Sequence, residues 1–311
     1  MAKILITESV HPIGPELLTA AGHTVVYADR DMDIIRREIV DADAVLVRII
    51  ELPGSLLATA KNLKIVSKHG VGYDNIDLDY CKNHGVAVTI TPNANSLSVA
   101  EHAFTLMLTL AKNIIPVSNK YRMVGFAAKN HAPGIEMTGK TLGLIGMGRI
   151  GKHVLHMCKD GLDMHVIVYD PYISEVPEGV ERVDDLSELL RRADIVTLHC
   201  LLTDETRKLI DRERLALMKP TALLINCARG PIVDEAALIE ALESGRLAGA
   251  GLDVTDPEPV APDSPLFKLP NVIVTPHYAP TTVESATRVS KIAAENINAV
   301  LAGQEPVGRI A

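Results

Sequence analysis

The sequence TLGLIGMGRIG, residues 141–151, decides the fold of the larger part of this chain. A five-residue β-strand pattern leads into three glycines, and a helical pattern follows. In this context the first glycine permits a tight turn, the second lets the backbone approach a pyrophosphate, and the third lets helix and strand pack closely. The motif therefore predicts a dinucleotide-binding βαβ unit with phosphates at the helix N-terminus. The expected cofactor contacts in this turn are Gly146, Gly148, Arg149, Ile150 and Gly151.

An acidic residue ends the next expected strand. Asp170 lies 19 residues after Gly151 (170 − 151), close to the ~20 typical of an acid that binds the adenosine ribose. Its carboxylate can accept hydrogen bonds from both ribose hydroxyls and would repel a 2′-phosphate. Pro171 and Tyr172 follow, so no arginine stands there to receive such a phosphate. The alternative is an ordinary turn formed by Asp170 with Pro171, but the coincidence of strand, glycines and acid favours NAD as the cofactor.

Two series of alternating strands and helices make up the chain. Alternation of this kind predicts parallel sheets covered by helices on both faces. The second series has six expected strands, which match one complete nucleotide-binding sheet. The expected strands cover residues 4–6, 24–27, 44–47, 63–66 and 86–90, then 141–145, 165–169, 194–199, 222–226, 250–253 and 272–275.

Two long helical patterns mark the domain boundaries. Ser98-Val99-Ala100-Glu101 has the form of a capping box, so a helix is expected to begin at Ser98 and to fade near Pro116. This helix is apolar almost all round and is expected to be buried. Residues 123–138 lack a clear period and are expected to form a loop, and a last helix is expected over 281–301. We predict two doubly wound α/β domains: a discontinuous flavodoxin-like substrate domain, residues 1–98 and 283–311, and a Rossmann-type nucleotide domain, residues 99–282.

Composition excludes several classes of function. The net charge is −8 and no long lysine or arginine cluster occurs, so nucleic acid is not an expected partner. No apolar stretch approaches the ~20 residues of a membrane span. The apolar run at the N-terminus is too short for a signal sequence. The four cysteines are scattered and are expected to be reduced thiols. These features predict a cytoplasmic protein that is not bound to a membrane.

Three polar segments follow expected strands of the second series. They are NCARGPIVD over residues 226–234, DVTDPEP over 253–259 and TPH over 275–277. Ligands of doubly wound sheets bind outside the carboxyl ends of the strands, so these segments are expected to line the functional site.

At these segments the chain resembles the D-isomer-specific 2-hydroxyacid dehydrogenase family. The resemblance extends over nearly the whole length and includes HGVGYDNID over 69–77, TPNANS over 91–96, SVAEH over 98–102, the glycine motif and the three polar segments. Within the family, the sequences NSLS over 95–98 and NCARG over 226–230 are most similar to those of phosphoglycerate dehydrogenases and hydroxypyruvate reductases. The resemblance implies NAD-dependent interconversion of a small D-2-hydroxy acid and its 2-keto acid. It also implies a homodimer, with the helix from Ser98 as a candidate dimer element.

The chemistry of such a reaction assigns roles to three residues. Arg229 fits the cation that holds the carboxylate and polarises the carbonyl, because its planar guanidinium binds oxygen pairs in fixed geometry. His277 fits the proton donor, since imidazole titrates near neutral pH. Glu258 fits the carboxylate that orients His277 and stabilises its protonated form. A surface arginine, a structural histidine and a solvated loop acid are the alternatives.

The resemblance implies further contacts. Backbone N–H groups around Val71 and Gly72 would bind the substrate carboxylate, and Arg48 is a further substrate contact. The implied cofactor contacts are Cys200, Cys227, Ala228 and Asp253. Asp253 would hold the nicotinamide carboxamide. For Cys200, packing in the hydrophobic core is an equal alternative to cofactor contact.

The nature of the substrate stays open at this point. A phosphorylated substrate would require cations, for which Arg48, Lys68 and His69 are candidates, whereas hydroxypyruvate or glyoxylate would require fewer. The active site is expected in the cleft between the domains, where hinge closure would exclude water. The chain ends soon after its last helix, so no C-terminal regulatory domain is expected.

Some features depart from the family pattern or suggest other functions. Leu201 stands where the family usually has proline, and Tyr278-Ala279-Pro280 replaces a smaller, glycine-bearing run, so the cofactor pocket is expected to differ there. His153 and His156 lie three apart on an expected helix, which we interpret as a solvated face and not a metal site. A non-enzymatic dinucleotide-sensing protein of the same fold is the alternative function, and the intact trio of Arg229, Glu258 and His277 argues against it.

Overall fold

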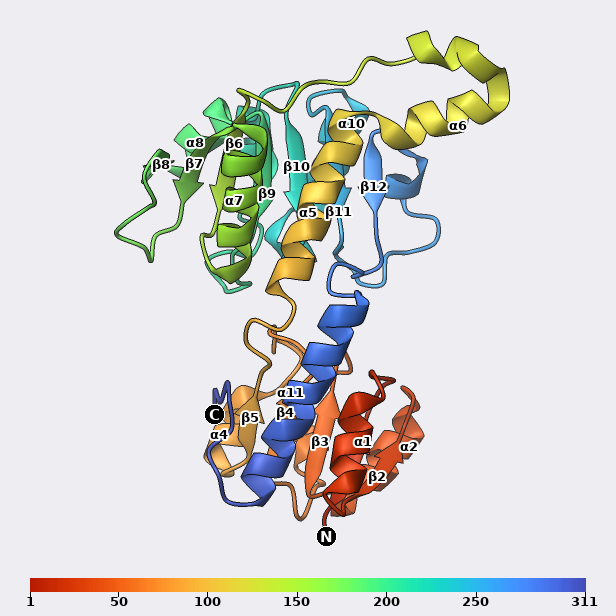
Figure 1. Ribbon diagram of the computed structural model, residues 1–311, viewed down its shortest axis with the longest axis vertical. Coiled ribbons are helices and arrows are strands. Elements are labelled where there is room, and N and C mark those ends of the chain that lie inside the picture. The colour runs from red at the N-terminus through yellow and green to blue at the C-terminus, as the bar shows by residue number, and fades with distance from the viewer. The chain divides into compact units, whose positions relative to one another are not determined.

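The computed structural model describes residues 1–311, and the chain forms two compact units, each built on one parallel sheet (Figure 1). Unit 1 comprises residues 1–95 and 280–311, and unit 2 comprises residues 96–279. Each boundary lies three residues before the expected one (98 − 95 and 282 − 279). Two parallel-sheet α/β units confirm the predicted fold class.

Unit 1 has a five-stranded sheet in the order β2-β1-β3-β4-β5, the order of flavodoxin-like folds. The strands β3 and β4 are buried along their whole length. The helices α1 and α11 pack against each other, and α11 also contacts β4 (Figure 1). The strands are β1 (Lys3–Ile6), β2 (Thr24–Tyr27), β3 (Ala44–Val47), β4 (Ile65–Lys68) and β5 (Ala87–Thr89). The helices are α1 (Ile13–Ala20), α2 (Met32–Glu38), η1 (Ile39–Asp41), α3 (Gly54–Leu57), α4 (Leu78–Asn83) and α11 (Val283–Leu301).

Unit 2 has a seven-stranded parallel sheet in the order β12-β11-β10-β9-β6-β7-β8. Its strands are β6 (Thr141–Ile145), β7 (His165–Tyr169), β8 (Val180–Arg182), β9 (Ile195–Leu198), β10 (Leu223–Asn226), β11 (Gly249–Leu252) and β12 (Val272–Val274). The prediction of six strands missed β8. That edge strand pairs with β7 through its backbone while its side chains stay largely exposed, so it leaves no hydrophobic pattern in the sequence.

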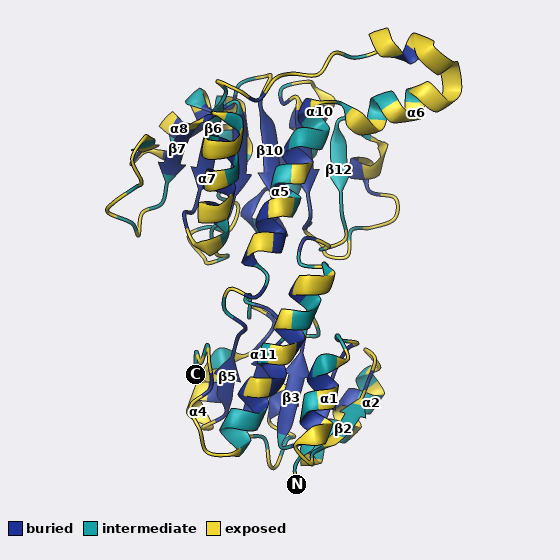
Figure 2. Ribbon diagram, in the orientation of Figure 1, coloured by how far each residue is buried: buried dark blue, intermediate teal, exposed yellow.

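Helices cover both faces of the sheet of unit 2. One apolar cluster packs α8, α9 and α10 against the sheet, and a second packs α5 and α7 against it. Figure 2 shows the buried strands behind the half-exposed helices α5 and α7. The helices of unit 2 are α5 (Ser96–Ala111), α6 (Ile114–Val124), η2 (Gly125–Asn130), α7 (Arg149–Leu162), α8 (Leu186–Arg192), α9 (Arg212–Leu217), η3 (Gly230–Ile232), α10 (Glu235–Glu243) and η4 (Pro265–Lys268). No helix of the chain combines the length and the hydropathy needed to cross a bilayer.

The start and end of α5 differ from the prediction. The helix begins at Ser96, so Ser98 lies inside it and is not a capping residue. Its hydroxyl donates to Ala279 O at 2.6 Å, and the predicted capping box is therefore wrong.

The chain also stays helical beyond the point where the prediction ended it. Pro116 lies in the first turn of α6, where its missing N–H costs no hydrogen bond. The end of α6 and the whole of η2 occupy much of the expected loop over 123–138. None of the residues of α6 is buried, and Figure 2 shows this helix mostly exposed, with some half-buried positions.

Candidate active site

The glycine motif forms the turn between β6 and α7. Gly146 has a φ of +90°, and a Cβ there would lie 2.8 Å from backbone atoms of His199 and Cys200. A Cβ on Gly151 would come within 2.3 Å of Gly146 O, so the first turn of α7 lies directly against the glycine turn. A Cβ on Gly148 would meet no atom within 4 Å. The turn thus offers an open backbone surface at a helix N-terminus, which fits the pyrophosphate of NAD.

Asp170 follows β7 and lies beside the same turn. One carboxylate oxygen accepts from Met147 N at 2.9 Å, and the other accepts from Tyr172 N at 3.0 Å. The side chain therefore takes part in a local turn with Pro171, as the alternative interpretation held. It also lies next to the glycine turn, as a ribose-binding acid would.

Two cysteines end neighbouring strands of unit 2. Cys200 follows β9 and packs, half-buried, against the apolar cluster of α8 to α10. Burial raises the pKa of its thiol to about 11, and burial also raises the pKa of Cys227 well above its ordinary value. Both thiols are neutral at neutral pH, and a neutral thiol is a poor nucleophile.

Arg229 belongs to the turn that follows β10, residues 226–231, which we call the Arg229 turn. The Asn226 side chain holds this turn from both sides: its amide nitrogen donates to Arg229 O at 2.9 Å, and its oxygen accepts from Ala228 N at 3.0 Å. The Arg229 guanidinium donates to Ala228 O at 2.8 Å. A conformationally fixed turn of this kind presents a guanidinium in defined geometry.

A glycine fixes the spacing between the Arg229 turn and the loop over 253–259, which we call the Glu258 loop. A Cβ on Gly230 would lie 1.9 Å from Thr255 O. The two backbones therefore touch at a place where only glycine fits. The sequence contains Gly230 within the NCARGPIVD motif, but the partner that makes glycine necessary is not visible in it.

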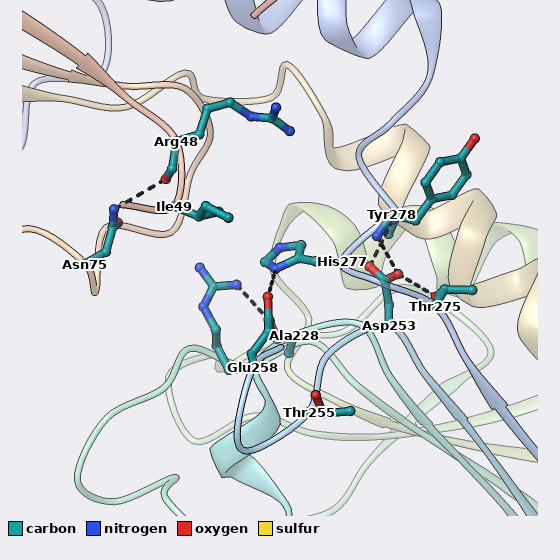
Figure 3. Close-up of polar contacts among 12 residues, drawn as sticks. Arg48, Ile49, Asn75, Ala228, Asp253, Thr255, Glu258, Thr275, His277 and Tyr278 are labelled. Carbon is teal, nitrogen blue, oxygen red and sulfur yellow. Dashed lines mark hydrogen bonds and ion pairs between the residues drawn. The ribbon is translucent and has the colours of Figure 1, made fainter. Parts of the chain in front are cut away.

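His277 and Glu258 form a direct pair. His277 Nδ1 lies 2.7 Å from Glu258 Oε1, and both side chains are about one-third exposed, 33% and 39% (Figure 3). An ionised carboxylate only accepts hydrogen bonds, so His277 Nδ1 carries the proton and Nε2 is the nitrogen left for proton exchange. The structure thus brings together two of the three predicted catalytic side chains and places the third on the adjoining turn.

Asp253 is 1% exposed, and its carboxylate faces the loop that carries His277. It accepts hydrogen bonds from Thr275 Oγ1 at 2.5 Å, Tyr278 N at 2.7 Å and Ala279 N at 2.9 Å (Figure 3). These three donors occupy most of its capacity. The carboxamide role that the family resemblance implies for Asp253 therefore competes with its hydrogen bonds to this loop.

The motifs that contain His102 and Thr275 assign no individual role to either residue. His102 Nε2 lies 3.0 Å from Thr275 Oγ1 and 3.5 Å from Asp253 Oδ1. A signal existed in the sequence: Ser98 and His102 are polar residues four apart on a largely apolar helix, so they share a face.

The expected substrate contacts of unit 1 surround the carboxyl ends of β3 and β4. Glu8 is buried and accepts hydrogen bonds from Arg48 N at 2.7 Å and Ile49 N at 3.0 Å, which fixes the backbone after β3. The guanidinium of Arg48 donates to Ser9 O at 3.0 Å. Val71 and Gly72 lie half-buried in the loop that follows β4.

The other two candidate cations are less available. Lys68 is 7% exposed, and its ammonium donates to Asn75 Oδ1 at 2.5 Å and to Arg48 O. Burial and the nearby charge of Arg48 lower the pKa of His69 to about 3, so this imidazole is neutral at neutral pH. Among the three candidates, Arg48 alone combines a permanent charge with partial exposure.

The helix face with His153 and His156 contains no metal-like cluster. No group of three or more His, Cys, Asp or Glu side chains in the chain could hold a metal ion. His156 Nδ1 lies 2.5 Å from Asp160 Oδ2, one turn further along α7, in an exposed pair.

Comparison with known proteins places these features together in one family. A family model described as the NAD binding domain of D-isomer specific 2-hydroxyacid dehydrogenases matches residues 104–279. A D-3-phosphoglycerate dehydrogenase from Methanocaldococcus jannaschii is 43% identical over 308 residues, which cover 98% of this chain and 58% of that protein. The chain spans little more than half the length of several curated phosphoglycerate dehydrogenases that it matches.

Other relatives match over almost their full length. A glyoxylate reductase from Thermofilum pendens is 38% identical over 319 residues, which cover 98% of this chain and 93% of that protein. Among solved structures, a D-lactate dehydrogenase from Aquifex aeolicus complexed with NAD and lactic acid is 33% identical with a TM-score of 0.88, and the match covers 96% of each chain.

Proposed function

This chain belongs to the D-isomer specific 2-hydroxyacid dehydrogenase family, and we propose that it is an NAD-dependent oxidoreductase that interconverts a small D-2-hydroxy acid and its 2-keto acid. The observation that carries the proposal is the contact of 2.7 Å between His277 Nδ1 and Glu258 Oε1 beside the Arg229 turn. These groups follow β10, β11 and β12 at the carboxyl edge of a sheet whose glycine turn fits a dinucleotide.

The side chains supply the remaining parts of the reaction. NADH, when bound, supplies the hydride that reaches C2 of the keto acid. The guanidinium of Arg229 holds the substrate carboxylate and polarises the keto oxygen. His277, as imidazolium, passes its Nε2 proton to the oxygen that becomes the hydroxyl, while Glu258 keeps the Nδ1 proton in place. In the reverse direction the same nitrogen accepts the hydroxyl proton.

For the substrate we favour a short keto acid with one carboxylate, such as glyoxylate or hydroxypyruvate, over phosphohydroxypyruvate. A phosphate needs several charged donors. The ammonium of Lys68 is buried and already donates to Asn75 Oδ1 and Arg48 O, and the imidazole of His69 is neutral, so neither is well suited to bind a phosphate. Arg48 and the backbone N–H groups around Val71 and Gly72 are the substrate contacts that we assign to unit 1. Phosphoglycerate remains the competing substrate, supported by the names of several relatives.

A kinetic panel tests both levels of the proposal. The protein is assayed with NADH against glyoxylate, hydroxypyruvate, pyruvate and phosphohydroxypyruvate. We expect turnover of the short acids, and in H277A a loss of kcat of about 10³-fold, with NADH affinity within about twofold of wild type. The variant H156A, at an exposed histidine of α7, is the matched control and should keep its activity.

Two results would contradict the proposal. Near-normal turnover in H277A would remove the role of His277. NADH binding without turnover of any acid in the panel would support the non-enzymatic dinucleotide sensor instead.

The partner that we propose for this chain is a second copy of itself. The side chains of α6 and η2 carry a run of exposed large apolar residues, which a monomer would leave in water. They are Ile114, Ile115, Tyr121, Met123, Val124 and Phe126. We expect sedimentation to show that the wild-type protein is a dimer and that F126D shifts it toward the monomer. A monomeric wild-type protein would contradict this assignment.

We also propose a cytoplasmic location, because the four cysteines are free thiols.

A further inference from the structure

Two side chains of α5 hold both ends of the segment that carries His277. We call residues 275–279 the His277 segment. Ser98 Oγ donates to Ala279 O at 2.6 Å, and His102 Nε2 lies 3.0 Å from Thr275 Oγ1. Ser98 and His102 are four residues apart and so lie on one face of α5. Ser98 is buried and the His102 side chain is 16% exposed, so these contacts are shielded from competing water.

Asp253 holds the same segment from the sheet side. Its backbone oxygen accepts from His277 N at 2.8 Å. Its carboxylate accepts from Thr275 before His277 and from Tyr278 N and Ala279 N after it. The histidine is therefore the centre of a loop whose two flanks are fastened to one buried carboxylate.

The donors and acceptors of this network have a defined order. The hydroxyl of Thr275 has one proton, which it donates to Asp253. Its oxygen must then accept from His102, so the proton of His102 is on Nε2. His102 thus donates to Thr275, and Thr275 donates to the carboxylate of Asp253. Hydrogen bonds in such a chain strengthen one another. The edge-on contact of the His102 ring with Tyr278, with centroids 6.3 Å apart, adds a packing contact at the same place.

The backbone of His277 needs this support. Its φ is +52°, in the left-handed region that residues with a Cβ seldom occupy. Such a conformation persists where the surroundings fix it, and it clusters at functional sites. The left-handed turn is what allows His277 Nδ1 to lie 2.7 Å from Glu258 while its flanks lie on Asp253 and α5.

We propose that His102, with Ser98 and Asp253, is a positioning residue that holds His277 in its left-handed conformation with Nδ1 on Glu258. This inference rests on the proposed function for its effect on turnover, although the geometry that it describes can be measured without turnover. His102 touches neither of the groups that exchange protons in the proposed reaction. Its removal should therefore lower kcat and leave the binding of NADH nearly unchanged.

The test compares H102L with H102Q. Leucine cannot donate to Thr275, whereas the amide of glutamine can. We expect kcat to fall between about 10- and 100-fold in H102L, the range for a reacting group displaced by up to 1 Å, and to recover to within about threefold of wild type in H102Q. The dissociation constant of NADH, from fluorescence titration, should stay within about twofold in both variants. H156L is the matched control, because His156 lies exposed on α7 and should leave kcat unchanged.

A second readout does not depend on turnover. The NMR signal of the His277 Cε1–H, assigned by its absence in H277A, should move in H102L and return toward its wild-type position in H102Q. Glutamine also lacks an aromatic ring, so recovery in H102Q reports the hydrogen bond and not a ring-current effect. If the wild-type protein reduces no 2-keto acid, the proposed function fails, and this signal still decides the positioning role.

Three outcomes would overturn the inference. They are an unchanged kcat and NMR signal in H102L, no recovery in H102Q, or a loss confined to NADH affinity. If H102L does not fold, T275V serves in its place, because valine keeps the shape of threonine and removes the hydroxyl that links His102 to Asp253. The same loss of kcat and the same movement of the His277 signal are then expected, and their absence would overturn the role of the network.

Discussion

The substitution G230A tests how closely the Arg229 turn and the Glu258 loop are packed. The added Cβ would lie 1.9 Å from Thr255 O, 2.2 Å from Thr255 C and 2.8 Å from Asp256 N. Ordinary contacts begin near 3.4 Å, so the two backbones must separate by about 1.5 Å (3.4 − 1.9). These are main-chain atoms, and no flexible side chain can move aside to accept the methyl group.

This separation would change both activity and stability. It lies between the turn that carries Arg229 and the loop that carries Glu258, and a displacement of about 1 Å costs about 10²-fold in rate. We expect kcat to fall by about that factor while NADH affinity stays within about threefold, because the glycine turn after β6 is untouched. Overpacking should lower the free energy of unfolding by about 1–3 kcal/mol.

The assays are steady-state kinetics at saturating NADH and urea unfolding. The matched control is G161A, since a Cβ at that position in α7 meets no atom within 4 Å. Gly161 lies in the last turn of α7, so alanine there should raise the free energy of unfolding by at most roughly 0.5–1 kcal/mol and leave kcat unchanged. Wild-type kcat and stability in G230A would refute the reasoning, because they would mean that the two backbones do not touch.

Two further predictions concern the cofactor and the pH dependence of stability. In D170N the loss of the negative charge should weaken NADH binding and strengthen NADPH binding. The ratio of the two dissociation constants should change by about tenfold in favour of NADPH, which corresponds to about 1.4 kcal/mol. Fluorescence titration with both dinucleotides measures this ratio, and an unchanged ratio would show that Asp170 does not face the ribose. Burial lowers the pKa of His199 to about 3, below its unfolded value of about 6.5. Between these two pH values the unfolded state binds a proton at His199 and the folded state does not. The free energy of unfolding therefore decreases as the pH falls from about 6.5 toward 3. H199Q should reduce the slope of unfolding free energy against pH by about 1.4 kcal/mol per unit between pH 6 and 4, and equal slopes in the two proteins would contradict the burial of a neutral His199.

The sequence by itself determined the features that depend on local pattern. Apolar runs of four or five residues marked the strands, because a parallel strand buried on both faces must be apolar throughout. The glycine spacing and Asp170 indicated the dinucleotide turn, because that turn needs residues without a side chain at fixed positions. Arg229, Glu258 and His277 could be selected because they follow expected strands, where ligands of such sheets bind, and because the family resemblance implies a chemical role for each.

The tertiary structure alone decided which of these groups depend on one another. Ser98 and Ala279 are 181 residues apart in the chain, and His102 and Thr275 are 173 apart, so no local pattern links them. The edge strand β8 is held by backbone pairing, and Gly230 is required by a carbonyl from another loop; neither cause leaves a periodic signal. Hydrophobic pattern reports how far a residue is buried, whereas the identity of its partner is fixed only when distant segments pack together.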